Sequence, residues 1–246
     1  MQDYKMGKNL IQQRRGRGTT TYRAHSFRWK GKASHRMYDE TERTSNIRGT
    51  VIDLIHCPGH SAPLAKIKYD NNETILEIAP NSIKVSDVVF SGNSAPINSG
   101  CTLPLKNIPE GTAIYNIESA PGDGGKFCRS AGSEAKIVSI MPRKVTIVLP
   151  SRKKKDFNPE CRATIGSIAG SGRQEKPFLK AGPVHHLMRA RGKLYPLTSA
   201  VAMNAVDHPF GCGRGRHVGK PKNAPRFAPS GRNVGKIHAR RTGKPR

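Results

Sequence analysis

Acidic residues are scarce in this chain of 246 residues, which has 17 Asp and Glu against 43 Lys and Arg and a net charge of +26. A charge imbalance of this size makes a compact state repel itself unless a polyanion neutralises it. The scarcity of acids therefore favours a nucleic-acid partner over a small-molecule substrate. The chain also lacks any run of about eighteen apolar residues and any N-terminal signal-peptide pattern, so we expect no membrane association and no secretion.

Closely spaced cysteines are absent as well. The five cysteines are scattered and odd in number: Cys57, Cys101, Cys128, Cys161 and Cys212. This pattern predicts reduced thiols in the cytoplasm and not a disulfide framework. Structural zinc sites usually contain a close Cys or His pair, so we expect no metal site, although His56 and His60 flank Cys57.

Apolar residues are concentrated in the middle of the chain, and positive charge is concentrated at its ends. Residues 37–172 contain 32 of the 48 Leu, Ile, Val and Phe residues, whereas residues 1–36 and 173–246 carry +9 and +15. The middle is long enough for one or two small domains. The ends have too little apolar surface to offset their chain entropy, so we expect them to be ordered by a partner.

The middle of the chain has the pattern of short β-strands. Apolar and β-branched residues recur between Gly, Pro and Asn turn signals, and no segment before residue 180 shows ten residues of helical periodicity. We expect strands at residues 47–56, 64–69, 74–78, 85–90, 112–117, 135–140, 145–149 and 163–168. This spacing predicts a mainly β fold of two small antiparallel barrels or sandwiches, divided near residue 90.

The N-terminal segment interleaves arginines with aromatic residues: Arg14, Arg15, Arg17, Tyr22, Arg23, Phe27, Arg28 and Trp29. Guanidinium groups bind phosphates, and aromatic faces stack on exposed bases. A solvated basic tail is the alternative, but the single tryptophan in a segment without a core favours RNA binding.

Two further segments could contact phosphates. The glycine-rich segment 121–126 places Lys126 beside several glycines and precedes Arg129, but it lacks the spacing of a nucleotide-binding P-loop. A hairpin turn explains it better, and a loop pressed against an RNA backbone is the other interpretation. The run at 151–155, which includes Arg152 and Lys153, follows an expected strand and favours a phosphate contact over a solvated turn.

Residues 202–221, AMNAVDHPFGCGRGRHVGKP, form the most informative segment. Ser199, Asp207 and His208 together supply the residue types of a hydrolase triad. However, adjacent residues of an extended chain point to opposite faces, so Asp207 cannot readily orient His208, and no G-x-S-x-G motif surrounds Ser199. We expect Asp207 to cap a turn or pair with an arginine, and His208 to donate to RNA oxygens.

This segment resembles the signature loop of the ribosomal protein L2 family, the second universal protein of the large ribosomal subunit. Six other blocks resemble the family in the same order: IQQRRGRGT (11–19), APLAKI (62–67), LPLKNIPEGT (103–112), PGDGGKFCRSAG (121–132), CRATIG (161–166) and GRNVGKIHARRTGKPR (231–246). Phe210 resembles the archaeal–eukaryotic branch. Ser199, Ala205 and Cys212 depart from the family pattern.

The resemblance implies an OB-like barrel followed by an SH3-like barrel, with long basic N- and C-terminal extensions. The implied parts are a basic RNA-binding extension at 1–36, an OB-like RNA-binding barrel at 37–90, an SH3-like barrel at 91–190 and a basic glycine-rich extension at 191–246. It also implies a structural constituent of the large subunit. The protein would be a primary rRNA binder that supports subunit assembly, subunit association, tRNA binding and the peptidyl-transferase region.

The implied partners are large-subunit rRNA, neighbouring ribosomal proteins and a contact to the small subunit, with no membrane, in ribosomes of the cytoplasm. No cofactor is implied beyond rRNA-associated magnesium. A catalytic role proposed in the family for the histidine at His208 is not expected here, so the chain is predicted not to be an enzyme. The predicted rRNA-binding residues are Arg14, Arg15, Arg17, Tyr22, Arg23, Arg28, Trp29, Lys126, Arg129, Arg152, Lys153, Arg162, Met203, Asn204, Asp207, His208, Arg214, Arg216, His217, Lys220, Arg226, Arg232, Arg240 and Arg241.

Two alternatives remain from the sequence. A free-standing nucleic-acid chaperone would be equally basic and β-rich, but it does not need a unique histidine-bearing glycine loop. A hydrolase or transferase that uses His208 would show turnover in the absence of RNA.

Overall fold

The computed structural model describes residues 8, 10–173 and 175–237. The chain divides into two compact units, one of residues 26–179 and one that combines residues 1–25 with residues 180–246. The predicted residues Arg240 and Arg241 lie outside the described part. Each unit is described below by itself.

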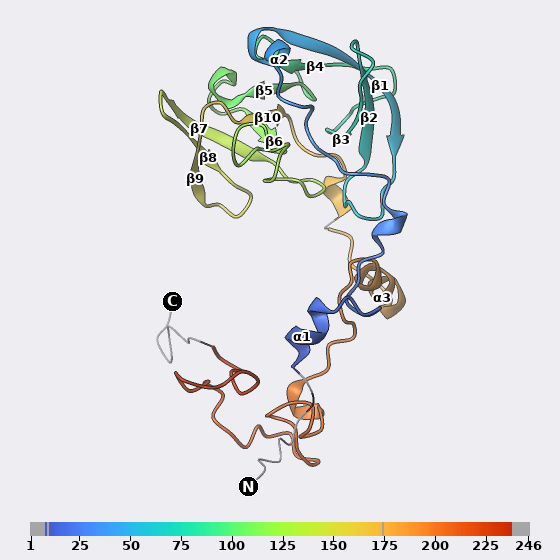
Figure 1. Ribbon diagram of the computed structural model, residues 1–246, viewed down its shortest axis with the longest axis vertical. Helices are drawn as coiled ribbons and strands as arrows, with labels where there is room; N and C mark the ends of the chain where they lie inside the picture. The colour runs from blue at the N-terminus through green and yellow to red at the C-terminus, as the bar shows by residue number, and fades with distance from the viewer. Residues whose placement is uncertain (1–7, 9, 174, 238–246) are drawn as a thin grey trace. The chain divides into compact units, whose positions relative to one another are not determined.

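The unit of residues 26–179 contains a ten-stranded sheet (Figure 1). Its strands follow the order β3-β2-β1-β4-β5-β10-β6-β7-β8-β9. The strand bounds are β1 Asn46–Ile55, β2 Leu64–Tyr69, β3 Thr74–Ile78, β4 Val88–Gly92, β5 Thr102–Pro104, β6 Ala113–Tyr115, β7 Ala135–Met141, β8 Lys144–Val148, β9 Lys154–Phe157 and β10 Arg162–Ile165. Neighbouring strands are antiparallel except β4 and β5, which pair in parallel through Ser91 and Thr102.

The mainly β fold class predicted from the sequence is confirmed. Strands β2 and β3 have the predicted bounds, and six further predicted segments overlap an observed strand by at least three residues. The sequence did not predict β5, which has three residues, or β9, whose sequence KKDF lacks apolar alternation.

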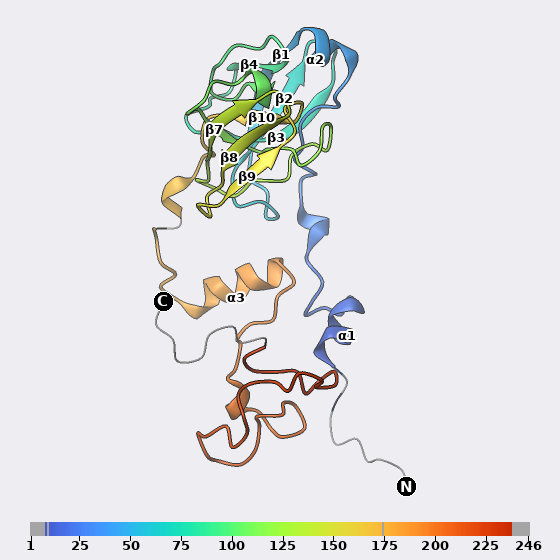
Figure 2. The same cartoon turned by 90° about the vertical axis from the view of Figure 1, so that its left-hand side faces the viewer.

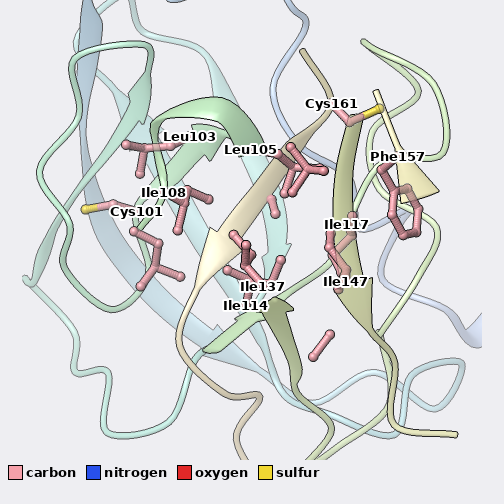
Figure 3. Packing of buried hydrophobic residues seen from close by; sticks show 14 of the residues in the cluster. Cys101, Leu103, Leu105, Ile108, Ile114, Ile117, Ile137, Ile147, Phe157 and Cys161 are labelled. Atoms are coloured by element: carbon pink, nitrogen blue, oxygen red, sulfur yellow. The ribbon is translucent and has the colours of Figure 1, made fainter. Parts of the chain in front are cut away.

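Apolar side chains fill three clusters in this unit. One lies in the first half of the sheet and includes Val51, Ile67 and Val89. The largest belongs to the second half, where Leu103, Ile137, Ile147 and their neighbours pack together (Figure 3). The third cluster takes Leu64 and Ile78 from the first half and Tyr115 and Ile168 from the second. The two halves therefore share apolar core as well as a continuous sheet.

The N-terminal side of this unit differs from the expectation that residues 1–36 make no core. Ala33, His35 and Arg36 are buried, with at most 4% of their surface exposed. Ala33 packs into the third apolar cluster, and a polar network, described below, binds His35 and Arg36. Helix α2, Glu40–Thr44, follows and is capped by Asp39, whose side chain accepts a hydrogen bond from the Glu42 N–H.

The other unit has little regular structure. It contains helix α1, Ile11–Gly16, and helix α3, Ala181–Ala190, after which the chain is largely irregular (Figure 2). Among its described residues, Phe210 is the one buried large apolar side chain. No helix in the described residues combines the length and apolarity that crossing a bilayer requires.

Candidate nucleic-acid interface

The arginines of the N-terminal segment that were predicted to bind rRNA are exposed, and one of them packs on Tyr22. Arg14 and Arg15 lie on α1, and Arg14, Arg15, Arg17 and Arg23 are all exposed. The guanidinium of Arg15 lies 5.6 Å from the centroid of the half-buried Tyr22 ring. A cation–π contact of this kind leaves the positive charge available to an anion. The structure thus brings a basic surface and an aromatic ring together within this segment.

Trp29 belongs to the other unit and lies against the turn after β1. A Cβ on Gly59 would come within 2.6 Å of the indole ring, so only glycine permits this close packing. The Trp29 side chain is still 42% exposed. The ring is therefore held in place while much of it remains accessible, as base stacking requires. Arg28, next to it, is exposed and lies 5.5 Å from the Phe27 ring centroid.

The glycine-rich loop at 121–126 is organised by its own acidic residues. The Glu118 carboxylate accepts hydrogen bonds from the Gly122 and Gly124 N–H groups, at 3.1 Å each. The Asp123 carboxylate accepts from the Gly125 N–H and from two preceding N–H groups. The backbone N–H groups that could bind a phosphate therefore already donate to carboxylates of the protein. The structural-turn interpretation is confirmed for the backbone, and the exposed Lys126 ammonium lies 4.0 Å from the Asp123 carboxylate.

The prediction that Arg162 contacts rRNA is wrong. Its side chain is 1% exposed and forms ion pairs with Glu42 and Glu118. Burial alone would raise the pKa of Glu118, but its hydrogen bonds to Arg162 and the charge of that residue lower it below the ordinary value. Arg162 lies in β10, where all four residues are buried. Because the strand is buried, this guanidinium cannot reach RNA, and it neutralises acids inside the protein.

The same network binds the chain preceding α2 to the sheet. Arg36 forms ion pairs with Asp39, Glu42 and Glu73, and its hydrogen bond and charge lower the pKa of Asp39. His35 Nε2 lies 2.6 Å from the Asn116 carbonyl oxygen. Burial, together with the nearby positive charges, lowers the pKa of His35 to about 4, so this ring is neutral at pH 7.

The Arg129 side chain also forms hydrogen bonds inside the protein. Its guanidinium donates to the Gly125 and Ala33 carbonyl oxygens, and burial lowers its pKa. The predicted surface contact by Arg129 is therefore replaced by a bridge between the glycine-rich loop and the chain before α2. Arg152 and Lys153, in contrast, are exposed in the turn between β8 and β9, where they were expected.

The loop at 203–211 has a defined conformation. Asp207 and His208 both donate their backbone N–H to the Asn204 carbonyl oxygen, at 2.9 and 3.2 Å. A Cβ on Gly211 would come within 2.4 Å of that same oxygen, so the turn requires glycine at this position. The Phe210 ring is 9% exposed and lies close to Gly235.

The two residues that the triad hypothesis needs are engaged elsewhere. The Asp207 carboxylate forms an ion pair with Lys8 at 2.8 Å, and not with an arginine as expected. The Phe210 N–H donates to His208 Nδ1 at 3.0 Å. A neutral His208 that accepts at Nδ1 carries its proton on Nε2. This arrangement makes His208 a hydrogen-bond donor at Nε2 and leaves no free lone pair for a general base.

Most other predicted residues of the C-terminal segment are exposed side chains. Met203 is half-buried and Asn204 is exposed. Lys220 is exposed and donates to the Pro209 carbonyl oxygen. Arg232 is half-buried, and its buried Nη1 has no hydrogen-bond partner within the described chain. The remaining exposed members are Arg214, Arg216, His217 and Arg226.

The described residues contain no group of three or more His, Cys, Asp or Glu side chains placed to hold a metal ion. All five cysteines are free thiols, and His60 Nδ1 lies 3.3 Å from Cys57 Sγ. Lys154 and Lys155, which belong to the basic run at 151–155, are exposed in β9, and Lys136 of β7 is an exposed lysine that the sequence reasoning did not single out. No local sequence signal singles out Lys136, because its place beside β9 depends on the pairing of β7, β8 and β9.

Comparisons with known proteins identify relatives that span nearly the whole chain. Residues 7–91 match the family described as "Ribosomal Proteins L2, RNA binding N-terminal domain", and residues 98–228 match "Ribosomal Proteins L2, C-terminal domain". The chain is 54% identical over 241 residues to a Methanosphaera stadtmanae protein named "Large ribosomal subunit protein uL2", which covers 98% of this chain and 100% of the relative. Proteins of the same name from Methanothermobacter thermautotrophicus and Methanococcus maripaludis are 52% and 51% identical, over 98% and 97% of this chain and 100% of each relative.

Proposed function

Because the chain belongs to the ribosomal protein L2 family, we propose that it is an rRNA-binding structural constituent of the large ribosomal subunit. The observation that carries this conclusion is the match of both family domains, in order, across residues 7–91 and 98–228. Full-length relatives at about half identity support it. The ordered blocks noted in the sequence belong to this family, in its archaeal–eukaryotic type.

The exposed basic residues of both chain ends are the proposed rRNA contacts. Their positive charges would neutralise phosphates and release counterions, which makes such binding strong and dependent on salt. Phosphate contacts fix position, while Trp29 and Tyr22 supply rings on which unpaired bases stack. We place Arg162 outside this set, because its charge is satisfied by buried acids.

The finer role is that of a primary rRNA binder, which supports assembly, subunit association, tRNA binding and the peptidyl-transferase region. Its partners would be rRNA, neighbouring ribosomal proteins and the small subunit, with no membrane, in ribosomes of the cytoplasm. The division near residue 90 would separate an OB-like RNA-binding barrel from an SH3-like barrel. The basic extensions on either side would bind rRNA.

We assign no catalysis to the chain. His208 Nδ1 accepts from the Phe210 N–H, and the Asp207 carboxylate binds Lys8. His208 would therefore present an Nε2–H donor to an RNA oxygen, and RNA would carry the chemistry of its surroundings.

The test is binding of the full chain to a transcript of the large-subunit rRNA, compared with an unrelated RNA of equal length. A ribosomal constituent should bind the rRNA transcript at least about a hundredfold more tightly at moderate salt, as specific nucleic-acid complexes do. Equal affinity for the two RNAs, with strand-annealing activity on both, would identify a free-standing chaperone and contradict the proposal.

A further inference from the structure

Strand β9 forms one edge of the ten-stranded sheet. It pairs with β8 alone, from Val148 opposite Lys154 to Val145 opposite Phe157. An edge strand presents unpaired backbone groups along its free side, and lysines commonly protect such an edge from another strand. Here the positive charges extend through the preceding turn, because Arg152, Lys153, Lys154 and Lys155 are all exposed.

The one acidic residue of β9 does not cancel these charges. Asp156 accepts hydrogen bonds from Lys144 Nζ at 3.0 Å and from Thr146 Oγ1 at 2.8 Å. These bonds lower the pKa of Asp156 below its ordinary value, so it stays ionised and paired with Lys144. Within the described residues, no acid forms an ion pair with any cation from Arg152 to Lys155.

A cross-strand row extends the basic surface over the sheet. Lys136 of β7 is opposite Val148 of β8, and Val148 is opposite Lys154 of β9. Directly paired residues share a face of the sheet, so Lys136 and Lys154 lie on the same face, about 10 Å apart at their backbones. Both lysines are exposed. Their flexible arms can therefore reach one continuous stretch of a polyanion.

Lys155 lies on the opposite face of β9 and is held by aromatic rings. Its Nζ is 4.0 Å from the Phe127 ring centroid and 5.2 Å from that of Phe157. The two rings meet edge to face, with centroids 5.2 Å apart. Cation–π contact positions an ammonium group without neutralising it. A lysine placed in advance loses less side-chain entropy when it binds an anion.

We propose that Arg152–Lys155 and Lys136 form a further RNA-binding surface at the β9 edge, which contacts the sugar–phosphate backbone with Lys155 as its positioned cation. Charge complementarity selects the occupant, since the surface has five cations and the one acid of β9, Asp156, is paired with Lys144. Point charges on lysines read phosphates and not base edges, so binding here is independent of sequence. This inference rests on the proposed function, and it adds a site on the folded sheet to the contacts of the basic ends.

The experiment compares full-length variants binding to the large-subunit rRNA transcript across a range of salt concentrations. The test variant is Lys154→Gln/Lys155→Gln, and the matched control is Lys68→Gln/Lys84→Gln, which removes two exposed charges elsewhere in the same unit. Each lost phosphate contact reduces the slope of log affinity against log salt by roughly 0.7 to 0.9. We expect the test variant to lose roughly 1.5 units of slope and the control less than half a unit.

The outcomes separate the two claims. If wild-type protein shows no preference for the rRNA transcript, the proposed function fails. If wild type binds as expected but the test variant has the slope of the control, the β9 surface is wrong and the proposed function stands. If the test variant binds rRNA as wild type does but is not incorporated into subunits, the β9 edge contacts a neighbouring protein and the inference is wrong.

A second variant, Phe127→Leu, tests the role of the ring. Leucine keeps an apolar side chain but removes the cation–π contact, so affinity should fall roughly two- to fivefold while the salt slope stays unchanged. Trp29 fluorescence during urea unfolding would show that the variant folds. Affinity equal to wild type in a folded variant would contradict the positioning of Lys155.

Discussion

His208 shows how one hydrogen bond limits what a side chain can do. The Phe210 N–H donates to its Nδ1, so the ring offers a donor at Nε2 and no free acceptor. Protonation at Nδ1 would require this bond to break. The residue is therefore suited to contact an RNA oxygen and unsuited to remove a proton.

Replacing His208 with Gln should reduce peptide-bond formation by assembled ribosomes less than about tenfold, under 1.4 kcal/mol of barrier. The glutamine amide keeps an acceptor for the Phe210 N–H and a donor toward RNA. The measurement is single-turnover peptidyl transfer across pH 6–8.5, on subunits shown to contain the variant. A loss of a hundredfold or more in complete particles, with an imidazole-like pH dependence removed, would establish general-base catalysis instead.

The charge of Arg162 neutralises two buried acids and so stabilises the folded protein. Removing one partner of a buried ion pair leaves the other charge uncompensated, at a cost of roughly 3–5 kcal/mol. Arg162→Met should lower the free energy of unfolding by about that amount, since it exposes Glu42 and Glu118 to an apolar neighbour. Urea unfolding followed by Trp29 fluorescence measures it, with the exposed Arg152→Met as the control. Equal stability of the two variants would contradict the buried ion pairs and would restore Arg162 as a predicted rRNA contact.

His35 predicts a pH dependence of stability. Its pKa is about 4 in the folded protein and near the ordinary 6.5 when unfolded. Between these values the unfolded state binds the extra proton, so stability is full above pH 6.5 and falls as pH drops toward 4. This group contributes up to roughly 3 kcal/mol of that loss.

Comparison with His35→Gln isolates this contribution. Glutamine can still donate to the Asn116 carbonyl oxygen but does not titrate. Glu77, whose pKa burial raises to about 7, acts in the opposite sense but is present in both proteins and cancels. The difference in unfolding free energy between wild type and variant should therefore change between pH 6.5 and 4 and stay constant above. A difference that is constant over the whole range would show that His35 is not buried as a neutral ring.

At the scale of elements, the sequence predicts most of the sheet because alternation and turn residues are local signals. Strand β2 shows this well, since Ala65, Ile67 and Tyr69 are buried while Lys68 is exposed. Strand β9 was missed because its sequence is charged and its pairing with β8 is a tertiary property. The burial of Arg162 was missed for a related reason, since the acids that neutralise it lie at positions 42 and 118.

Helix α1 places two arginines of the N-terminal segment on six residues of helix. A helix this short is marginal by itself, so we expect it to present charge and not to stabilise the fold. Replacing Arg14, Arg15 and Arg17 together with Gln should flatten the salt dependence of rRNA binding by up to roughly three units of slope. The same titration of the transcript measures it. An unchanged slope would assign these arginines to solvent.

At the scale of the whole molecule, apolar core and net charge are separated. All three apolar clusters lie in the unit of residues 26–179, and among its described residues the other unit buries a single large apolar side chain. Composition alone predicted this division. It could not predict that residues 33–36 join the core, because the hydrogen bonds of His35 and the ion pairs of Arg36 bind this segment in addition to the apolar packing of Ala33.

The central claim is that these charges hold the chain on the rRNA of the large subunit. The most direct measurement is sedimentation of ribosomes from cells that express the tagged full-length chain, at moderate and at high salt. The account predicts that the chain sediments with large subunits at moderate salt and leaves only at high salt, as counterion release requires. A chain that sediments free of large subunits at moderate salt, or that stays with nucleic acid of every kind, would contradict it.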